Sequence, residues 1–189
     1  MFLKQLHSLA PERMVYVDES GFDDTLHYPY GYCHRSERFY GDIVGHRSER
    51  LSVVGAWRKG GEVIAPMVYQ GYTNTQVFCQ WFEEMLLPEL IPGQIVILDN
   101  AGFHPRKRLE ELLSGTGCQL WFLPPYSPDL NKIEKFWARL KKQVGKVLKE
   151  CENLFDAIAQ SLRLVVLSHS VAAIESPQTQ TRFCDAGTN

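Results

Sequence analysis

The strongest constraint on the fold of this chain is the apolar run Ile95–Leu98, which contains no polar residue and is followed directly by Asp99. A short apolar run without alternation is typical of a strand that is buried on both faces. Such a strand requires covering helices on either side of its sheet. With 189 residues, of which 44% are apolar and 12% aromatic, the chain is long enough for one α/β domain with a sizeable core.

Hydrophobic periodicity and turn residues predict five strands and four helices. The first three strands follow one another, and we expect them to pair antiparallel, with a turn at 59–61 between the second and third. The Gly-rich stretch from 21 to about 50 is predicted to be a loop or an irregular hairpin. The predicted strands are 14–18, 51–57, 62–69, 95–98 and 119–123. The first predicted helix begins at Asn74 or Thr75 and ends at Pro88 or Pro92. The other three are 106–114, a helix from Asp129 through Leu148, and 152–167.

Cysteine usage and the lack of long apolar segments indicate the cellular compartment. The five cysteines are widely spaced and form no Cys-x-x-Cys pair, which argues against a disulfide framework or a thiolate zinc site and favours a reducing cytosol. The N-terminus has no signal-peptide pattern, and no stretch approaches the roughly 18 apolar residues of a membrane span. We therefore expect a cytoplasmic protein without membrane contact.

Two acidic residues stand at the carboxyl ends of predicted strands, Asp18 after 14–17 and Asp99 after 95–98. Ligands of α/β sheets bind at such strand ends. A single aspartate there is more often a turn-capping residue, but two on separate strands favour a site. If the strands are neighbours, the carboxylates repel each other unless their pKa values rise or a cation binds. Glu134, on a long predicted helix, supplies a third carboxylate.

A basic segment lies on the same helix. The net charge of the whole chain is −2, from 20 Lys and Arg against 22 Asp and Glu. A surface that binds nucleic acid would therefore have to be a local basic patch. Basic residues of this kind bind phosphate backbones, although a solvated helix face explains the segment almost as well when it is taken alone. Residues 132–149 hold seven basic side chains against Glu134 alone: Lys132, Lys135, Arg139, Lys141, Lys142, Lys146 and Lys149.

Three carboxylates suit metal-dependent phosphodiester chemistry. They would hold two Mg²⁺ or Mn²⁺ ions about 3.5–4 Å apart, where the ions activate an attacking water or hydroxyl and stabilise the leaving oxygen. Oxygen ligands fit these hard ions and not zinc. The chain has no Gly-x-x-x-x-Gly-Lys-Ser/Thr loop, no Gly-x-Ser-x-Gly elbow and no Gly-x-Gly-x-x-Gly turn, which weakens the kinase, hydrolase and dinucleotide-binding interpretations.

Three segments surround the acids, and they are Tyr16–Phe22, Leu98–His104 and Phe122–Trp137. Together and in this order they resemble the IS630/Tc1/mariner transposases, and the IS630 group most closely. The intervening Ala65–Gly71 is also similar to the family, so the resemblance covers about residues 14–150. Asp99 and Glu134 are separated by 34 residues, which is the interval expected for the second and third acids of the family's DDE triad.

The resemblance implies an RNase H-like fold, in which helices flank a mixed five-stranded sheet. The catalytic domain would span 14–167, after a short lead-in of residues 1–13 and before a polar, poorly ordered tail of residues 168–189. The first, second and third acids of the triad, which would bind two Mg²⁺ or Mn²⁺ ions, would be Asp18, Asp99 and Glu134.

The implied activity is the cutting of transposon ends and the joining of the freed 3′-hydroxyl to target DNA, commonly at TA. The implied partner is double-stranded DNA, bound by a homodimer in the bacterial cytoplasm, at the nucleoid. The family normally carries an N-terminal helix-turn-helix region, and because about 13 residues precede the first predicted strand, we expect end recognition to lie outside this chain. Lys132 replaces the family's usual proline, which removes some preorganisation at the helix start.

A second group of residues would support the site or contact DNA. For Asn100 and His104, a turn-forming asparagine and a helix-capping histidine are the alternatives, and Tyr126 could serve packing alone. The group consists of Asn100, His104, Tyr126, Asn131, Lys135, Arg139, Lys141 and Lys142.

Two other functions stay open at this point. A catalytically silent remnant would keep the fold and the basic helix, and it would bind DNA whether or not the three acids are present. Another RNase H-like nuclease would act on RNA–DNA hybrids. Metal dependence separates the transposase from the remnant, and substrate preference separates it from the nuclease.

Overall fold

The structure is a computed structural model that describes residues 6, 9–23, 50–58, 63–125 and 127–170. Five strands form one mixed sheet in the order β3-β2-β1-β4-β5. The antiparallel part consists of β1 (Met14–Asp23), β2 (Arg50–Arg58) and β3 (Val63–Gln70), whereas β4 (Ile95–Leu98) and β5 (Gln119–Phe122) extend the sheet in parallel from β1. The predicted five strands and the antiparallel pairing of the first three are confirmed.

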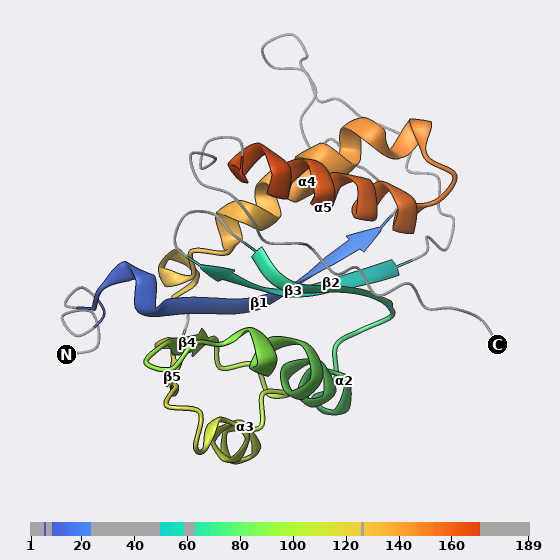
Figure 1. Cartoon of the computed structure of the whole chain (residues 1–189). Coiled ribbons are helices and arrows are strands. Elements are labelled where there is room, and N and C mark those ends of the chain that lie inside the picture. The colour runs from blue at the N-terminus through green and yellow to red at the C-terminus, as the bar shows by residue number, and fades with distance from the viewer. Residues whose placement is uncertain (1–5, 7–8, 24–49, 59–62, 126, 171–189) are drawn as a thin grey trace, which may run out of the picture.

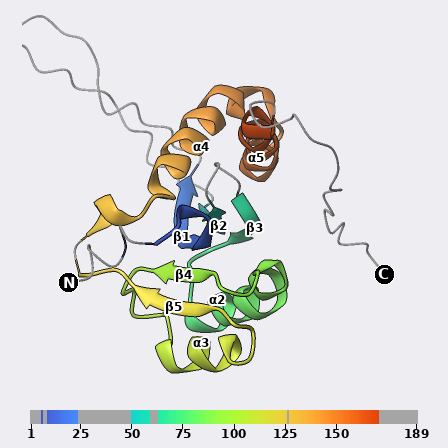
Figure 2. The same cartoon turned by 60° about the vertical axis from the view of Figure 1, so that its left-hand side comes forward.

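Helices cover both faces of the sheet (Figures 1 and 2). On one face lie α2 (Thr75–Trp81) and α3 (Arg106–Leu113), and on the other lie α4 (Glu134–Val147) and α5 (Leu154–Ser170). Because the helices lie on both sides, the sheet is the middle layer of three. This is the mixed sheet flanked by helices that the sequence predicts.

Short helical turns extend and connect these elements. The predicted cap begins α2, where the side chain of Asn74 accepts a hydrogen bond from the amide of Val77 at 3.0 Å. A π-helical turn, Phe82–Leu86, and a 3₁₀ turn, Leu87–Glu89, continue α2 toward β4. Further 3₁₀ turns are Pro11–Arg13, Pro128–Leu130 and Leu148–Glu150.

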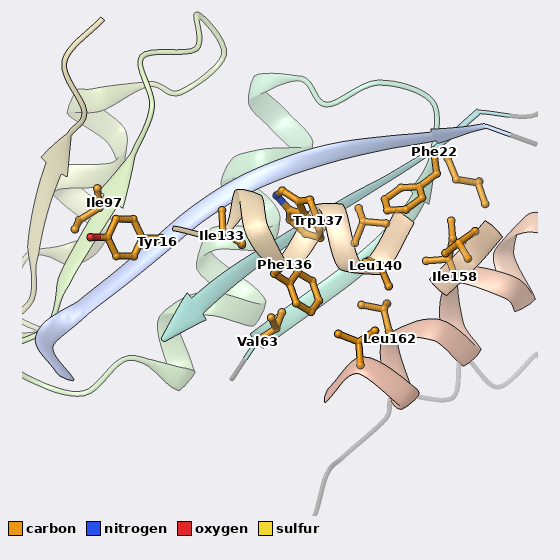
Figure 3. Close-up of a cluster of buried hydrophobic side chains, with 14 of the residues drawn as sticks. Tyr16, Phe22, Val63, Ile97, Ile133, Phe136, Trp137, Leu140, Ile158 and Leu162 are labelled. Carbon is orange, nitrogen blue, oxygen red and sulfur yellow. The ribbon is translucent and has the colours of Figure 1, made fainter. Parts of the chain in front are cut away.

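Alternate side chains of β4 fill two separate cores, one on each face of the sheet. Val96 and Leu98 pack with the residues of α2 and α3, while Ile95 and Ile97 face the core under α4 and α5. Figure 3 shows this second core, in which aromatic and aliphatic side chains of α4 lie over the sheet. The prediction that Ile95–Leu98 is buried on both faces is therefore confirmed.

Three predicted boundaries differ from the observed ones by three residues or more. The first strand does not end at 18 but continues to Asp23, because its pairing with β2 continues that far. Beyond Asp18 burial alternates from residue to residue, so no apolar run marks this second half of the strand. The helix predicted from Asp129 begins at Glu134, since Pro128–Leu130 forms a separate 3₁₀ turn. The last helix extends past 167 to Ser170.

Some predictions fall outside the described residues. These are the turn at 59–61, residues 24–49 of the Gly-rich stretch, Tyr126, and the tail after 170. Within the part of the chain that the structure describes, no helix has the length and apolar character needed to cross a membrane.

Candidate active site

The three predicted acids line one pocket. It has a volume of about 420 Å³ and lies where β4 and β5 end and α4 begins. Asp18 reaches it from β1, Asp99 from the residue after β4, and Glu134 from the first turn of α4. The other lining residues are Asn100, Ala101, Leu123, Pro124, Pro125, Ser127 and Asn131.

Asp18 lies inside β1 and not at its end, which corrects the predicted position. It still lies near the edge of the parallel part of the sheet, because the pairing of β1 with β4 stops at Tyr16. Its carboxylate is nearly buried, and Oδ2 accepts a hydrogen bond of 3.1 Å from the indole Nε1–H of Trp137. Helical periodicity alone predicts Trp137 as a buried apolar residue, so no sequence pattern indicated this polar contact.

The environment of Asp18 disfavours its charged form. Burial is the largest cause, and the neighbouring carboxylate of Glu19 adds to it, with smaller effects from Glu134 and Asp99. The pKa of Asp18 is raised to about 7. The carboxyl groups of the pocket therefore disfavour one another's ionisation, and a bound cation would offset this repulsion.

Asp99 is held through one carboxylate oxygen. Its Oδ1 accepts a hydrogen bond from the backbone N–H of Ala101 at 2.9 Å and lies 3.0 Å from Nδ1 of His104. The hydrogen bond from His104 lowers the pKa of Asp99, against the opposing effect of partial burial. The Asp99 side chain is half exposed, at 49%, so it faces the pocket opening.

His104 is a buried polar residue and caps no helix. Its ring packs against the rings of Phe78 and Phe103, at centroid distances of 4.3 Å and 4.5 Å, and Nε2 lies 3.0 Å from Oε1 of Glu19. Burial alone lowers the pKa of His104, but the hydrogen bonds to Asp99 and Glu19 outweigh it and raise the pKa to about 9. Glu19 belongs to the segment Tyr16–Phe22, but the sequence assigned it no role, and its side chain lies on the opposite face of β1 from Asp18.

Two asparagines complete the pocket wall. Asn100 donates a hydrogen bond from its side chain to the carbonyl oxygen of Leu123, which joins the loop after β4 to the end of β5. Asn131 is buried, and its Oδ1 has no hydrogen-bond partner among the described residues. Both residues line the pocket as polar groups.

The predicted basic residues lie along α4 outside the pocket wall. Lys135, Arg139, Lys141 and Lys142 are all exposed, and the pocket itself is lined by none of them. The ammonium group of Lys141 lies 5.7 Å from the centroid of the Phe22 ring. The helix therefore buries its apolar side against the sheet and keeps its cations in solvent.

The donor chemistry of the pocket fits a hard divalent cation. Its polar side chains offer carboxylate oxygens from the three acids and an amide oxygen from Asn131, which are the ligands that Mg²⁺ and Mn²⁺ prefer. Among the described residues, no three His, Cys, Asp or Glu side chains already stand close enough to hold one ion. The pocket thus supplies suitable oxygens from three separate elements.

Comparison with known proteins places the chain among nucleic-acid enzymes. Residues 13–154 match the family described as DDE superfamily endonuclease. No curated protein matches the chain.

Several solved structures share the fold at low sequence identity. The Mos1 strand transfer complex is similar with a TM-score of 0.58 and 18% identity, over 89% of this chain and 58% of that one. The catalytic core domain of BIV integrase matches with a TM-score of 0.51 and 15% identity, over 80% of this chain and 81% of that one. A simian T-cell lymphotropic virus intasome in complex with a PP2A regulatory subunit matches with a TM-score of 0.57 and 14% identity. The match covers 96% of this chain and 61% of that one. The RNase H-like fold of the integrase and transposase cores is therefore present here, in a chain that spans about three fifths of the Mos1 and intasome chains.

Proposed function

The chain belongs to the DDE superfamily endonucleases, and on this basis we propose that it is the catalytic domain of a transposase of the IS630 group. It cuts double-stranded DNA at transposon ends and transfers the freed 3′-hydroxyl to target DNA at TA. The observation that carries the proposal is the meeting of Asp18, Asp99 and Glu134 in one pocket. The fold shared with the Mos1 strand transfer complex supports the transfer step, and the segments Tyr16–Phe22 and Phe122–Trp137 support the IS630 assignment.

In this proposal the three acids hold two Mg²⁺ or Mn²⁺ ions. When bound, the ions activate the attacking water or hydroxyl and stabilise the leaving oxygen of the phosphodiester. The indole of Trp137 fixes the carboxylate of Asp18, and two N–H donors fix that of Asp99. Asn100 fixes the pocket rim through its bond to Leu123. The chain thereby orients its acids before substrate arrives.

The DNA backbone lies along the exposed side of α4 in this proposal. Glu134 begins the helix at the pocket, and basic side chains follow it on exposed positions. The catalytic domain spans 14–167 and acts as a homodimer on DNA. The phosphate contacts come from Lys135, Arg139, Lys141 and Lys142.

The experiment that tests this function is a nicking and strand-transfer assay. The purified chain is incubated with supercoiled plasmid and with pre-cut duplex ends, in Mg²⁺, Mn²⁺ or EDTA. We expect cutting in the presence of either ion and none in EDTA. A parallel preparation of Glu134→Ala should not cut, which excludes a contaminating nuclease. DNA binding without cutting in any ion would instead favour the silent remnant, and preferential cutting of RNA–DNA hybrids would favour another RNase H-like nuclease.

The basic residues of α4 give a separate prediction about DNA affinity. Replacing Lys141 and Lys142 together by Ala should reduce the slope of log affinity against log salt by up to about 0.9 for each phosphate that the variant no longer neutralises, because fewer counterions are released. Fluorescence anisotropy with a labelled duplex, repeated over a series of salt concentrations, measures this slope. Gln143→Ala shortens a neutral neighbour on the same helix and should leave the slope unchanged. An unchanged slope in the double lysine variant would contradict the proposed DNA-binding face.

A further inference from the structure

The hydrogen-bond network behind Asp99 points to a role for two residues outside the triad. We propose that Glu19 and His104 are positioning residues that hold Oδ1 of Asp99 and so present its other oxygen, Oδ2, to the pocket. This inference rests on the proposed function of the acidic pocket. It concerns residues that touch neither DNA nor metal themselves.

Two donors converge on the same oxygen of Asp99. The Nδ1 atom of His104 lies 3.0 Å from Oδ1, and the backbone N–H of Ala101 donates to Oδ1 at 2.9 Å. An oxygen that accepts two hydrogen bonds is a poorer ligand for a cation than its unengaged partner. Oδ2 is therefore the oxygen left available on the pocket side.

His104 is buried and is held at both ring nitrogens. Its side chain is only 1% exposed, and the rings of Phe78 and Phe103, which also contact each other, pack against it. On the far side, Nε2 lies 3.0 Å from Oε1 of Glu19, whose side chain is only 12% exposed. The imidazole therefore has one orientation, in which one nitrogen faces Asp99 and the other faces Glu19.

This network links the two strands that carry the first and second acids. Glu19 follows Asp18 in β1, and Asp99 follows the last residue of β4. The link matters most for Asp99, because a half-exposed carboxylate has rotational freedom that a metal ligand would lose on binding. Partners that orient a ligand in this way commonly change metal affinity by about 10-fold to 100-fold when they are removed.

Two substitutions of His104 separate positioning from packing. His104→Asn places an amide N–H near the position of Nδ1, so it keeps the donor to Asp99 but does not reach Glu19. His104→Gln places its N–H near the position of Nε2, so it still reaches Glu19 but offers no donor to Asp99. A role in packing alone predicts that the Gln variant is at least as good as the Asn variant, because only the Asn variant takes from the largely buried Glu19 its contact with residue 104.

The measurement is Mn²⁺ and Mg²⁺ binding to the full chain without DNA, by calorimetry, with urea unfolding of each variant as the measure of stability. We expect His104→Asn to bind nearly as wild type and His104→Gln to bind about 10-fold to 100-fold more weakly. Plasmid nicking should follow the same order. Equal affinities of the two variants, or weaker binding by the Asn variant, would overturn the positioning role.

A further control distinguishes this inference from the proposed function. Asp99→Asn removes the ligand itself and should weaken cation binding in either case. If wild type binds no divalent cation and Asp99→Asn behaves as wild type, the proposed function is wrong and the positioning role is wrong with it. If wild type binds, Asp99→Asn does not, and both His104 variants match wild type, only the positioning role is wrong.

Discussion

Replacing Asp99 by Asn should lower the rate of plasmid nicking by about 10³-fold or more, the scale of effect when one group of a catalytic unit is removed. The amide keeps an oxygen that can accept the hydrogen bonds from Ala101 and His104, so the loop after β4 should keep its structure. DNA affinity should stay the same or rise, because the substitution removes one negative charge near the phosphates. The assay pairs initial nicking rates with anisotropy titrations of the same preparations.

The control for this substitution removes an acid elsewhere. Glu110 is an exposed residue of α3 that does not line the acidic pocket, so Glu110→Gln should nick and bind as wild type does. If Asp99→Asn loses folding, DNA binding and cutting together, the prediction is contradicted. Asp99 then serves the fold, and the proposed triad loses its second member.

The second large effect is on stability. Phe136→Ala should lower the free energy of unfolding by about 3–5 kcal/mol, because it leaves a cavity in a closely packed core. Phe136 is 1% exposed and packs beside Trp137, with ring centroids 5.2 Å apart, on the buried side of α4, the helix that also carries Glu134 (Figure 3). Urea unfolding followed by tryptophan fluorescence measures the change.

Phe155→Ala is the matched control on the same side of the sheet. Phe155 belongs to α5 and is 49% exposed, so its truncation removes little buried area and should change stability by less than about 1 kcal/mol. Comparable losses of stability in the two variants would mean that α4 is not packed on the sheet as described.

Much of the architecture could be predicted because it depends on local patterns. The run Ile95–Leu98 indicates its burial on both faces directly, since every residue in it has to be apolar. The approach of Asp18 and Asp99 to one pocket was also predictable in part. Asp99 follows a buried strand, and neighbouring parallel strands end at the same edge of a sheet. These inferences need only the sequence next to each residue.

The boundaries that were wrong depend on features that hydrophobic periodicity does not show. The end of β1 is set by its pairing with β2, which lies beyond residues 24–49, and in this part of the strand only the alternate residues Ser20 and Phe22 are buried. The start of α4 is set by a competing 3₁₀ turn, Pro128–Leu130, whose residues can form either kind of helix. Local periodicity does not indicate either choice.

The polar contacts of the site were the least predictable part. The hydrogen bond between Trp137 and Asp18 joins residues 119 positions apart, and the contact between His104 and Glu19 spans 85. An indole is apolar except for one N–H, so a hydrophobic pattern classifies Trp137 by its ring and not by its donor. Only the packing of α4 over β1 brings that donor to a carboxylate.

The hydrogen bond between Trp137 and Asp18 also determines how the pocket responds to change. Trp137 lies one helical turn after Glu134, so a single turn of α4 carries the third acid and also holds the first. A displacement of α4 that moves Glu134 therefore also moves the indole N–H that holds the carboxylate of Asp18, while the backbone of Asp18 stays in the sheet. Asp99 belongs to a separate loop and does not follow this movement. A substitution that shifts the turn from Glu134 to Trp137 should accordingly disturb two of the three acids at once, whereas one that shifts the loop after β4 disturbs Asp99 alone.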